Sequence, residues 1–314
     1  MTRLRWTTGE RLSPIHAARC FALGIRGVDA AIVSGIEAPM AELSNRLAAA
    51  EIELALFWQR LMSSAAAGES DLDACVAALT AAGCSSLSLD STASAIASRL
   101  ADVRLVHAER FPKLAEQLTL RGRPLREQWD GFGMGLLKRI GKLTHPSFLP
   151  KNATVILLSP YRGGDGGLDA SAQRVWIEAM LTNPVPEIPE VIRLVWLIGQ
   201  AGLTEGLSSG PEDSRGDPWV VPARLPRVAA LAMMPLALEA ASYLEMIPQP
   251  ADKLSSLFAS AAQAWRLGVD VSTLDALEHW WRQFQDLQTP PAVTLKALDR
   301  MLHSENASNS ESPR

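Results

Sequence analysis

Apolar residues in the first hundred positions recur at helical spacing. Ser13 followed by Pro14 is typical of a helix start, because proline's missing N–H costs nothing in the first turn. Beyond Pro39, apolar residues advance in steps of three and four, which predicts a helix with one packed face. The run ends by Gly68, and this short length favours packing inside the chain over a coiled coil with another chain. The residues of this seam are Met40, Leu43, Leu47, Ala50, Leu54, Phe57 and Leu61.

Two further helices are expected before residue 105. Ser70 with Asp73 three positions later resembles a capping box, and Gly83 is suited to the left-handed residue that ends a helix. Asp90 is placed to cap the next helix, whose apolar positions are Ile96, Leu100 and Val103. We therefore expect residues 1–105 to form a helical region.

The pattern changes in the middle of the chain, where residues 106–205 are expected to form a central α+β region. Residues 154–158 are a short apolar run with a β-branched start, which predicts a buried strand. A glycine-rich stretch follows at 162–167. Residues 173–181 favour a second strand, with a helix as the alternative, and residues 190–200 are apolar on all sides except at Arg193, as in a helix inside a core.

Residues 206–222 are rich in Gly, Ser, Pro and Asp and predict an exposed loop, followed by a C-terminal helical region at 223–303 and a disordered tail at 304–314. Ser272 with Asp275 repeats the capping-box pattern. The longest apolar stretch, 228–247, contains Glu239 and Glu245, so we interpret it as a buried helix rather than a membrane span. The predicted fold is a predominantly helical α+β protein, with helical N- and C-terminal regions around a central portion that holds a short sheet or hairpin.

Composition agrees with a folded chain. The 314 residues are 47% hydrophobic and 20% charged, which excludes a disordered or collagen-like protein. The net charge of -4 gives no indication of nucleic acid or an anionic membrane as a partner. The three cysteines form no C-x-x-C pair and the N-terminus has no secretory pattern, so we expect a cytoplasmic protein. Cys20 and Cys75 fall in helical stretches, and we interpret them as small apolar residues.

No complete catalytic or metal-binding motif is present. The five histidines lack the pairing of a zinc hydrolase, so we expect neither a metal nor another cofactor. Residues 206–210 fit G-x-S-x-G, but the strand and helix that this motif needs are not predicted around it. The order of strand, glycine-rich hairpin, strand and buried helix is similar to the core of zincin-like peptidases. In that family the helix carries the ligands, and residues 191–198 carry none, so the resemblance implies a zincin-like fold without its metal ligands.

Positive charge is concentrated between residues 104 and 142, a segment that contains nine basic and four acidic residues. Glycines at 131, 133 and 135 precede an apolar and basic run, so free N–H groups there could hold a phosphate. The alternative is a solvated face paired with acidic residues such as Glu187, Glu190, Asp213 and Asp217, and we favour it. The candidate ligand-binding residues are Arg121, Arg123, Arg126, Gly133, Lys138 and Lys142.

Because no catalytic constellation is complete, we expect a non-enzymatic scaffold or protein-interaction module. Its protein partner or acidic ligand would lie at segment 104–142, and we expect no membrane or nucleic-acid partner. The alternative is an enzyme or binding protein for a phosphate-containing molecule at the basic, glycine-rich stretch 121–142.

Overall fold

The computed structural model describes residues 2–208, 223–247, 251–287 and 291–310. A four-stranded mixed sheet lies at its centre. The strand order is β1 (Arg3–Thr8), β2 (Asn152–Leu158), β4 (Arg174–Glu178) and β3 (Gly166–Asp169). The first three strands are parallel, and β3 is antiparallel to β4 at the edge. The predominantly helical α+β fold predicted from the sequence is confirmed.

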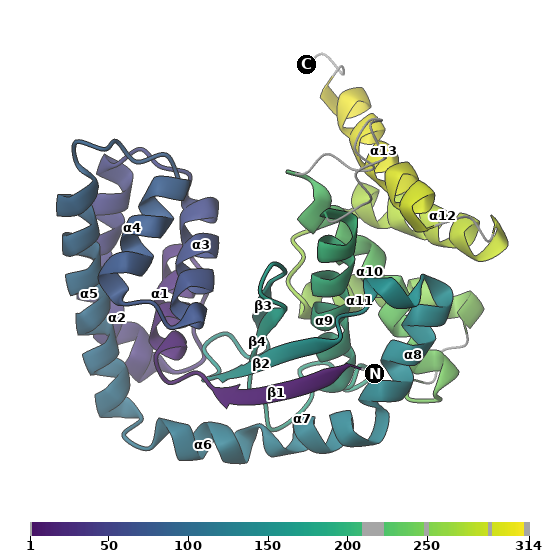
Figure 1. Cartoon of the computed structure of the whole chain (residues 1–314), viewed down its shortest axis with the longest axis horizontal. Coiled ribbons are helices and arrows are strands. Elements are labelled where there is room, and N and C mark those ends of the chain that lie inside the picture. The colour runs from purple at the N-terminus through teal and green to yellow at the C-terminus, as the bar shows by residue number, and fades with distance from the viewer. Residues whose placement is uncertain (1, 209–222, 248–250, 288–290, 311–314) are drawn as a thin grey trace.

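Five helices form a bundle on one face of the sheet (Figure 1). Alternate residues of β2 explain this arrangement, because successive side chains of a strand point to opposite faces. Ile156 and Leu158 pack with the bundle, whereas Val155 and Leu157 pack with the C-terminal helices. The bundle helices are α1 (Leu12–Ala22), α2 (Ala30–Ala49), α3 (Leu54–Ala67), α4 (Asp71–Ala81) and α5 (Leu89–Arg110).

A chain of short helices passes under the sheet from the bundle to the C-terminal part (Figure 1). It consists of α6 (Leu114–Arg121), α7 (Arg123–Gln128), a π-helical turn (Trp129–Gly133) and α8 (Met134–Leu143), followed by a 3-10 turn (Pro146–Phe148).

The first of the C-terminal helices packs against the other face of the sheet, and the others pack behind it. The C-terminal helices are α9 (Glu190–Ser208), α10 (Leu225–Tyr243), α11 (Phe258–Ala264), α12 (Val271–Leu287) and α13 (Pro291–Ser310), with a 3-10 segment (Ala251–Leu257) before α11. By length and composition α10 could cross a membrane, but 78% of its apolar window is buried in the fold. Its Glu239 is paired with Arg139 of α8. Both observations agree with the buried helix expected there.

The single helix expected from Pro39 to Leu61 is wrong, because this stretch belongs to two helices. Asp29 caps α2 through its side chain, so the helix begins nine residues before Pro39, and the chain turns between α2 and α3. Leu54 begins α3 and is 43% exposed. The other large seam residues are buried inside the chain, as expected: Met40, Leu43, Leu47, Phe57 and Leu61.

Strand β1 is missing from the predicted elements, since residues 1–105 were expected to be helical. Only Leu4 and Trp6 are apolar, and Arg3 and Arg5, which alternate with them, are exposed. The cap of Ser70 on α4 and the left-handed Gly83 are confirmed. Ser272 does not cap α12, because the Asp270 carboxylate accepts the Thr273 N–H instead.

Two predicted boundaries lie at or beyond the described residues. Helix α9 continues to Ser208, so the first residues of the loop expected at 206–222 are helical, and residues 209–222 lie outside the described part of the chain. Asp213 and Asp217 fall there. Helix α13 continues to Ser310, past the start of the tail expected at 304–314, and residues 311–314 are not described.

Candidate functional site

One face of α1 carries the side chains of a buried polar cluster. Ser13 lies in the first turn of the helix, which begins at Leu12 without a side-chain cap; its hydroxyl donates to Gly9 O at 2.7 Å and accepts the Ser159 N–H at 3.0 Å. His16 and Cys20 follow at helical spacing on the same face, and both side chains are fully buried. The bond to Ser159 therefore places them against the carboxyl end of β2.

Glu178, at the end of β4, is the anchor of this cluster. Its Oε1 lies 2.8 Å from His16 Nε2, and the side chain is completely buried. Five consecutive backbone N–H groups, from Tyr161 to Asp165, donate to its two carboxylate oxygens at 2.6–3.1 Å. Six donors thus surround one carboxylate, and the loop after β2 is wrapped around it.

Two glycines make this wrapping possible. Gly163 and Gly164 have φ values of 87° and 114°, in the region that side chains other than glycine rarely adopt. This conformation turns successive N–H groups toward one point, as in the backbone nests that bind anions. The glycine-rich stretch at 162–167 is therefore a loop built around the protein's own carboxylate.

The pKa of Glu178 is lowered and the pKa of His16 is raised, as in an ion pair. Burial alone would raise the pKa of Glu178, but the hydrogen bond and charge of His16 and the loop N–H groups outweigh burial and lower it. Burial lowers the pKa of His16, yet Cys20 and Glu178 outweigh that effect and raise it. We conclude that His16 is an imidazolium and Glu178 a carboxylate at neutral pH.

Asp165 connects this buried cluster to an open cleft. Its Oδ2 lies 3.7 Å from Cys20 Sγ on one side. On the other side it lies 3.6 Å from Arg19 Nη1 and 3.9 Å from Arg162 Nη1. Asp165 is the one carboxylate among the described residues that line the cleft.

Four arginines line this cleft, which we call the arginine cleft. Its volume is about 350 Å³, and it lies between β3, α9, α10 and the end of α11. The arginines come from α1, the loop after β2, α10 and the residue after Trp265, and Gln200 adds an amide. Apolar side chains such as Leu197, Leu231 and Leu267 form the rest of its wall. The four arginines are Arg19, Arg162, Arg227 and Arg266.

Arg266 occupies an unusual backbone position. Its φ of 61° is left-handed, and its N–H bonds to Gln263 O in the turn that ends α11. Glycine is preferred at such a position, since a side chain there costs about 1–2 kcal/mol. Burial and the neighbouring charge of Arg162 lower the pKa of Arg266. The left-handed backbone and the burial beside Arg162 each make arginine an unfavourable residue at this position.

The candidate residues from segment 104–142 do not converge on one site. Arg121 lines a hollow of about 700 Å³ together with Arg110 and Gln117, at the carboxyl end of the parallel strands. The Arg126 guanidinium lies 5.3 Å from the centre of the Trp6 ring. Arg123, Lys138 and Lys142 are exposed on α7 and α8.

Gly133 lies inside a helix, which contradicts the helix start expected at residues 131–135. It is buried in the π-helical turn between α7 and α8, so the chain is already helical before it. A Cβ at this position would lie 2.3 Å from the Trp129 ring. The missing side chain of Gly133 therefore lets the Trp129 ring lie against the backbone.

Part of the excess charge in segment 104–142 is neutralised within the fold. Arg104 pairs with Asp71, and Arg110 pairs with Asp29 at 3.1 Å. Arg139 binds both oxygens of Glu239, with its Nε at 3.0 and 3.1 Å from them. The acidic partners differ from the expected ones, since Glu190 pairs with Arg193 at 2.5 Å.

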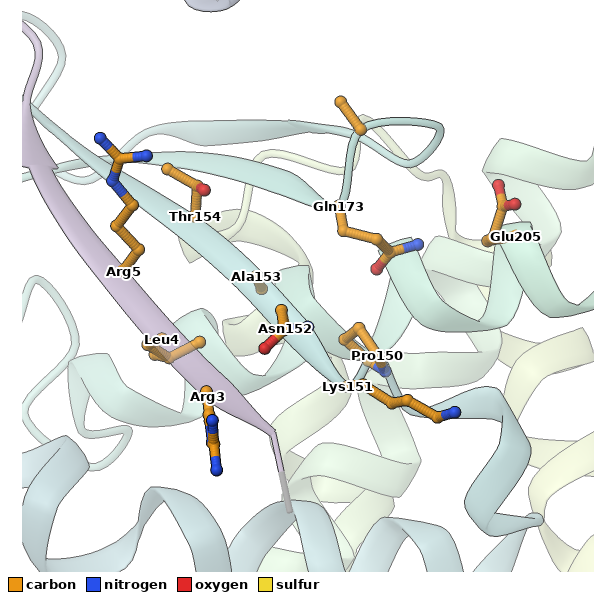
Figure 2. Close-up of a pocket in the computed structure, with 11 residues that line it drawn as sticks. Arg3, Leu4, Arg5, Pro150, Lys151, Asn152, Ala153, Thr154, Gln173 and Glu205 are labelled. Atoms are coloured by element: carbon orange, nitrogen blue, oxygen red, sulfur yellow. The ribbon is translucent and has the colours of Figure 1, made fainter.

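A second basic hollow lies at the opposite, amino end of the parallel strands (Figure 2). It measures about 680 Å³ and is lined by Arg3 and Arg5 of β1, by Lys151 and by Glu205. Both arginines are exposed on an edge strand, and Figure 2 shows Arg3 and Arg5 extending in different directions. This hollow has three basic residues with Glu205, whereas the arginine cleft has four arginines with Asp165.

The sequence contained one signal for the buried cluster. His16 and Cys20 are four residues apart in a predicted helix, which puts both side chains on one face. The interpretation of Cys20 as only a small apolar residue in a helix is incomplete, because its Sγ lies 3.7 Å from His16 Nε2. Asp165 and Glu178 carried no such signal, because only the sheet pairing brings them to α1.

Comparisons with protein-family models, curated proteins and solved structures give no match to this chain. The zincin-like resemblance thus rests on the order of elements alone. That order is present as β2, β3, β4 and α9, and Glu190 of α9 is engaged by Arg193.

Proposed function

We propose that this protein binds a small phosphate-bearing molecule in the arginine cleft. The observation that carries the proposal is that four arginines from four separate elements line one concavity of about 350 Å³. Arginine offers a planar set of donors that suits phosphate oxygens, and a volume of this size is typical of small-molecule sites.

The charge balance of the cleft supports an anionic ligand. Arg19 and Arg162 share one carboxylate, Asp165, and neither lies closer than 3.6 Å to it. Arg19 Nη1 is buried without a hydrogen-bond partner. Four like charges repel one another in a partly desolvated space, and a bound anion relieves that repulsion.

The buried cluster gives the cleft a fixed wall. Arg162 belongs to the loop that Glu178 holds, and Arg19 lies between His16 and Cys20 on α1. A binding site gains affinity when its groups are ordered before the ligand arrives, because less conformational freedom is lost on binding.

The test is a titration of thermal stability with inorganic phosphate, pyrophosphate and a nucleoside triphosphate at constant ionic strength. We expect a saturable rise in Tm with at least one of them, since a ligand at about 100 times its Kd contributes roughly 2.7 kcal/mol. Arg162→Ala and Arg227→Ala should abolish the rise. Arg121→Ala and Lys138→Ala remove the same charge outside the cleft and should preserve it.

Two results would overturn the proposal. One is a Tm that does not respond to any of these anions. The other is an equal loss of the response in the cleft variants and in the control variants, which would indicate general charge screening. The protein-interaction function expected from the sequence stays a prediction.

A further inference from the structure

His16, Cys20 and Asp165 bring an imidazole nitrogen, a sulfur and a carboxylate oxygen together. Cys20 Sγ lies 3.7 Å from His16 Nε2 and 3.7 Å from Asp165 Oδ2. One ligand atom from each residue lies within 4.8 Å of the others, and all three residues are buried. Outside this cluster, the described residues hold no other such group of three.

Two of these three separations, both from Cys20 Sγ, suit a tetrahedral zinc ion. Zinc bonds of about 2.0–2.3 Å put neighbouring ligand atoms about 3.3–3.8 Å apart. Both distances from Cys20 Sγ fall in this range, and the imidazole of His16 and the carboxylate of Asp165 lie within 4.8 Å of each other. We propose that His16, Cys20 and Asp165 bind a zinc ion, with one coordination position left open as in zinc sites that accept a further ligand.

The three ligands can compensate the charge of a zinc ion. The thiolate of Cys20 and the carboxylate of Asp165 would balance the two positive charges of the ion, and His16 would bind as a neutral imidazole. Because zinc binds deprotonated ligands, its binding releases protons.

Zinc binding must break the hydrogen bond between His16 and Glu178. His16 Nε2 lies 2.8 Å from Glu178 Oε1, and a nitrogen that binds zinc cannot donate a proton to that carboxylate. Glu178 keeps its five backbone donors from the loop, so its charge remains satisfied when the imidazole turns toward Cys20. Zinc binding and the histidine–glutamate bond are therefore two states of one cluster.

This inference goes beyond the proposed anion site and uses other residues, although Asp165 also lines the arginine cleft. A zinc site also differs from the expectation of a metal-free protein, because that expectation rested only on the lack of a suitable pair of histidines. A histidine and a cysteine four residues apart on one helix offer the same geometry with a softer ligand.

The test measures bound metal directly. Protein produced with zinc in the medium is dialysed against metal-free buffer, and its zinc content is measured by elemental analysis. We expect about one zinc per chain. Replacement by cobalt should give a thiolate-to-metal charge-transfer band, which reports a bond to cysteine sulfur.

Cysteine variants separate the site from adventitious binding. Cys20→Ser should remove the cobalt band and lower the zinc content by at least about tenfold. Cys75→Ser and Cys84→Ser are the controls and should change neither. If Cys20→Ser does not fold, Asp165→Asn replaces it, since this variant keeps the shape of the side chain and should weaken zinc binding.

The proposal is overturned if folded wild-type protein retains no zinc after incubation with the ion. It is also overturned if the cobalt band is absent, or if Cys84→Ser or Cys75→Ser removes it while Cys20→Ser does not.

Discussion

Two regions of this molecule are rich in basic residues, and they differ in how those residues are arranged. Segment 104–142 places them close together along the chain, but Arg104, Arg126 and Arg139 contact three different elements. The arginine cleft draws its four arginines from positions as far apart as 19 and 266, and all four line one concavity. A binding site thus depends on convergence in space, which a local excess of charge does not provide.

The largest expected effect on stability comes from removing Glu178, the anchor of the buried cluster. Glu178→Ala leaves the His16 charge and five loop N–H groups without their acceptor, so we expect a loss of about 3–5 kcal/mol in the free energy of unfolding. Urea denaturation measures it. Glu187→Ala is the control, because Glu187 is exposed, and it should change stability by less than about 0.5 kcal/mol. A small effect of Glu178→Ala would show that the cleft is held by other contacts.

A smaller effect is expected from His107, which lies inside segment 104–142 and is 4% exposed. Burial lowers its pKa from 6.5 to about 4, partly opposed by Asp29 and assisted by His16. The unfolded chain therefore binds a proton at a higher pH than the folded protein. Stability from this group is present above pH 6.5 and is lost as the pH falls toward 4, by up to about 3 kcal/mol.

The measurement compares wild type with His107→Gln in urea at several pH values. As the pH falls from 6.5 toward 4, the free energy of unfolding should decrease more for wild type than for His107→Gln. Parallel curves would show that His107 is accessible to protons in the folded state, and that this part of the segment is more open than the structure indicates.

Arg139 and Lys138 are neighbours on α8, and their variants compare a paired charge with an exposed one inside segment 104–142. Arg139→Ala leaves the carboxylate of Glu239, 7% exposed, without its partner, so we expect a loss of about 2 kcal/mol by chemical denaturation. Lys138→Ala removes the same charge from an exposed position and should change stability by less than about 0.5 kcal/mol. Equal effects would mean that the pair with Glu239 contributes nothing beyond net charge.

The smallest effect on stability is expected at Arg266. Arg266→Gly relieves a left-handed residue, so the free energy of unfolding should stay the same or rise by up to about 1 kcal/mol, while phosphate no longer raises Tm. Glu245→Gly is matched, because Glu245 has a φ of 56° after α10, outside the cleft. It should have the same effect on stability and leave the phosphate response intact. A phosphate response that survives in Arg266→Gly would remove this arginine from the site.

Local patterns predicted the parts of the fold that local forces determine. The buried strand at 154–158, the apolar helix at 190–200 and the Ser70 cap are each visible in a few consecutive residues. Strand β1 was missed because its stability comes from pairing with β2, almost 150 residues away. The arginine cleft was missed for the same reason, since its members share no stretch of sequence. Within the buried cluster, only the spacing of His16 and Cys20 was accessible.

The pairing of β1 with β2 also sets an order of assembly. Arg3 is in register with Asn152, so the first strand must wait until about half of the chain has been synthesised. The bundle helices emerge during that interval without Ile156, Leu158 and Trp176, which complete their apolar core. Domains usually fold as they emerge, and distant strand pairs are slow to form. A nascent chain of this protein therefore carries an exposed apolar face, and the middle strands that cover it are also the ones that join its two halves.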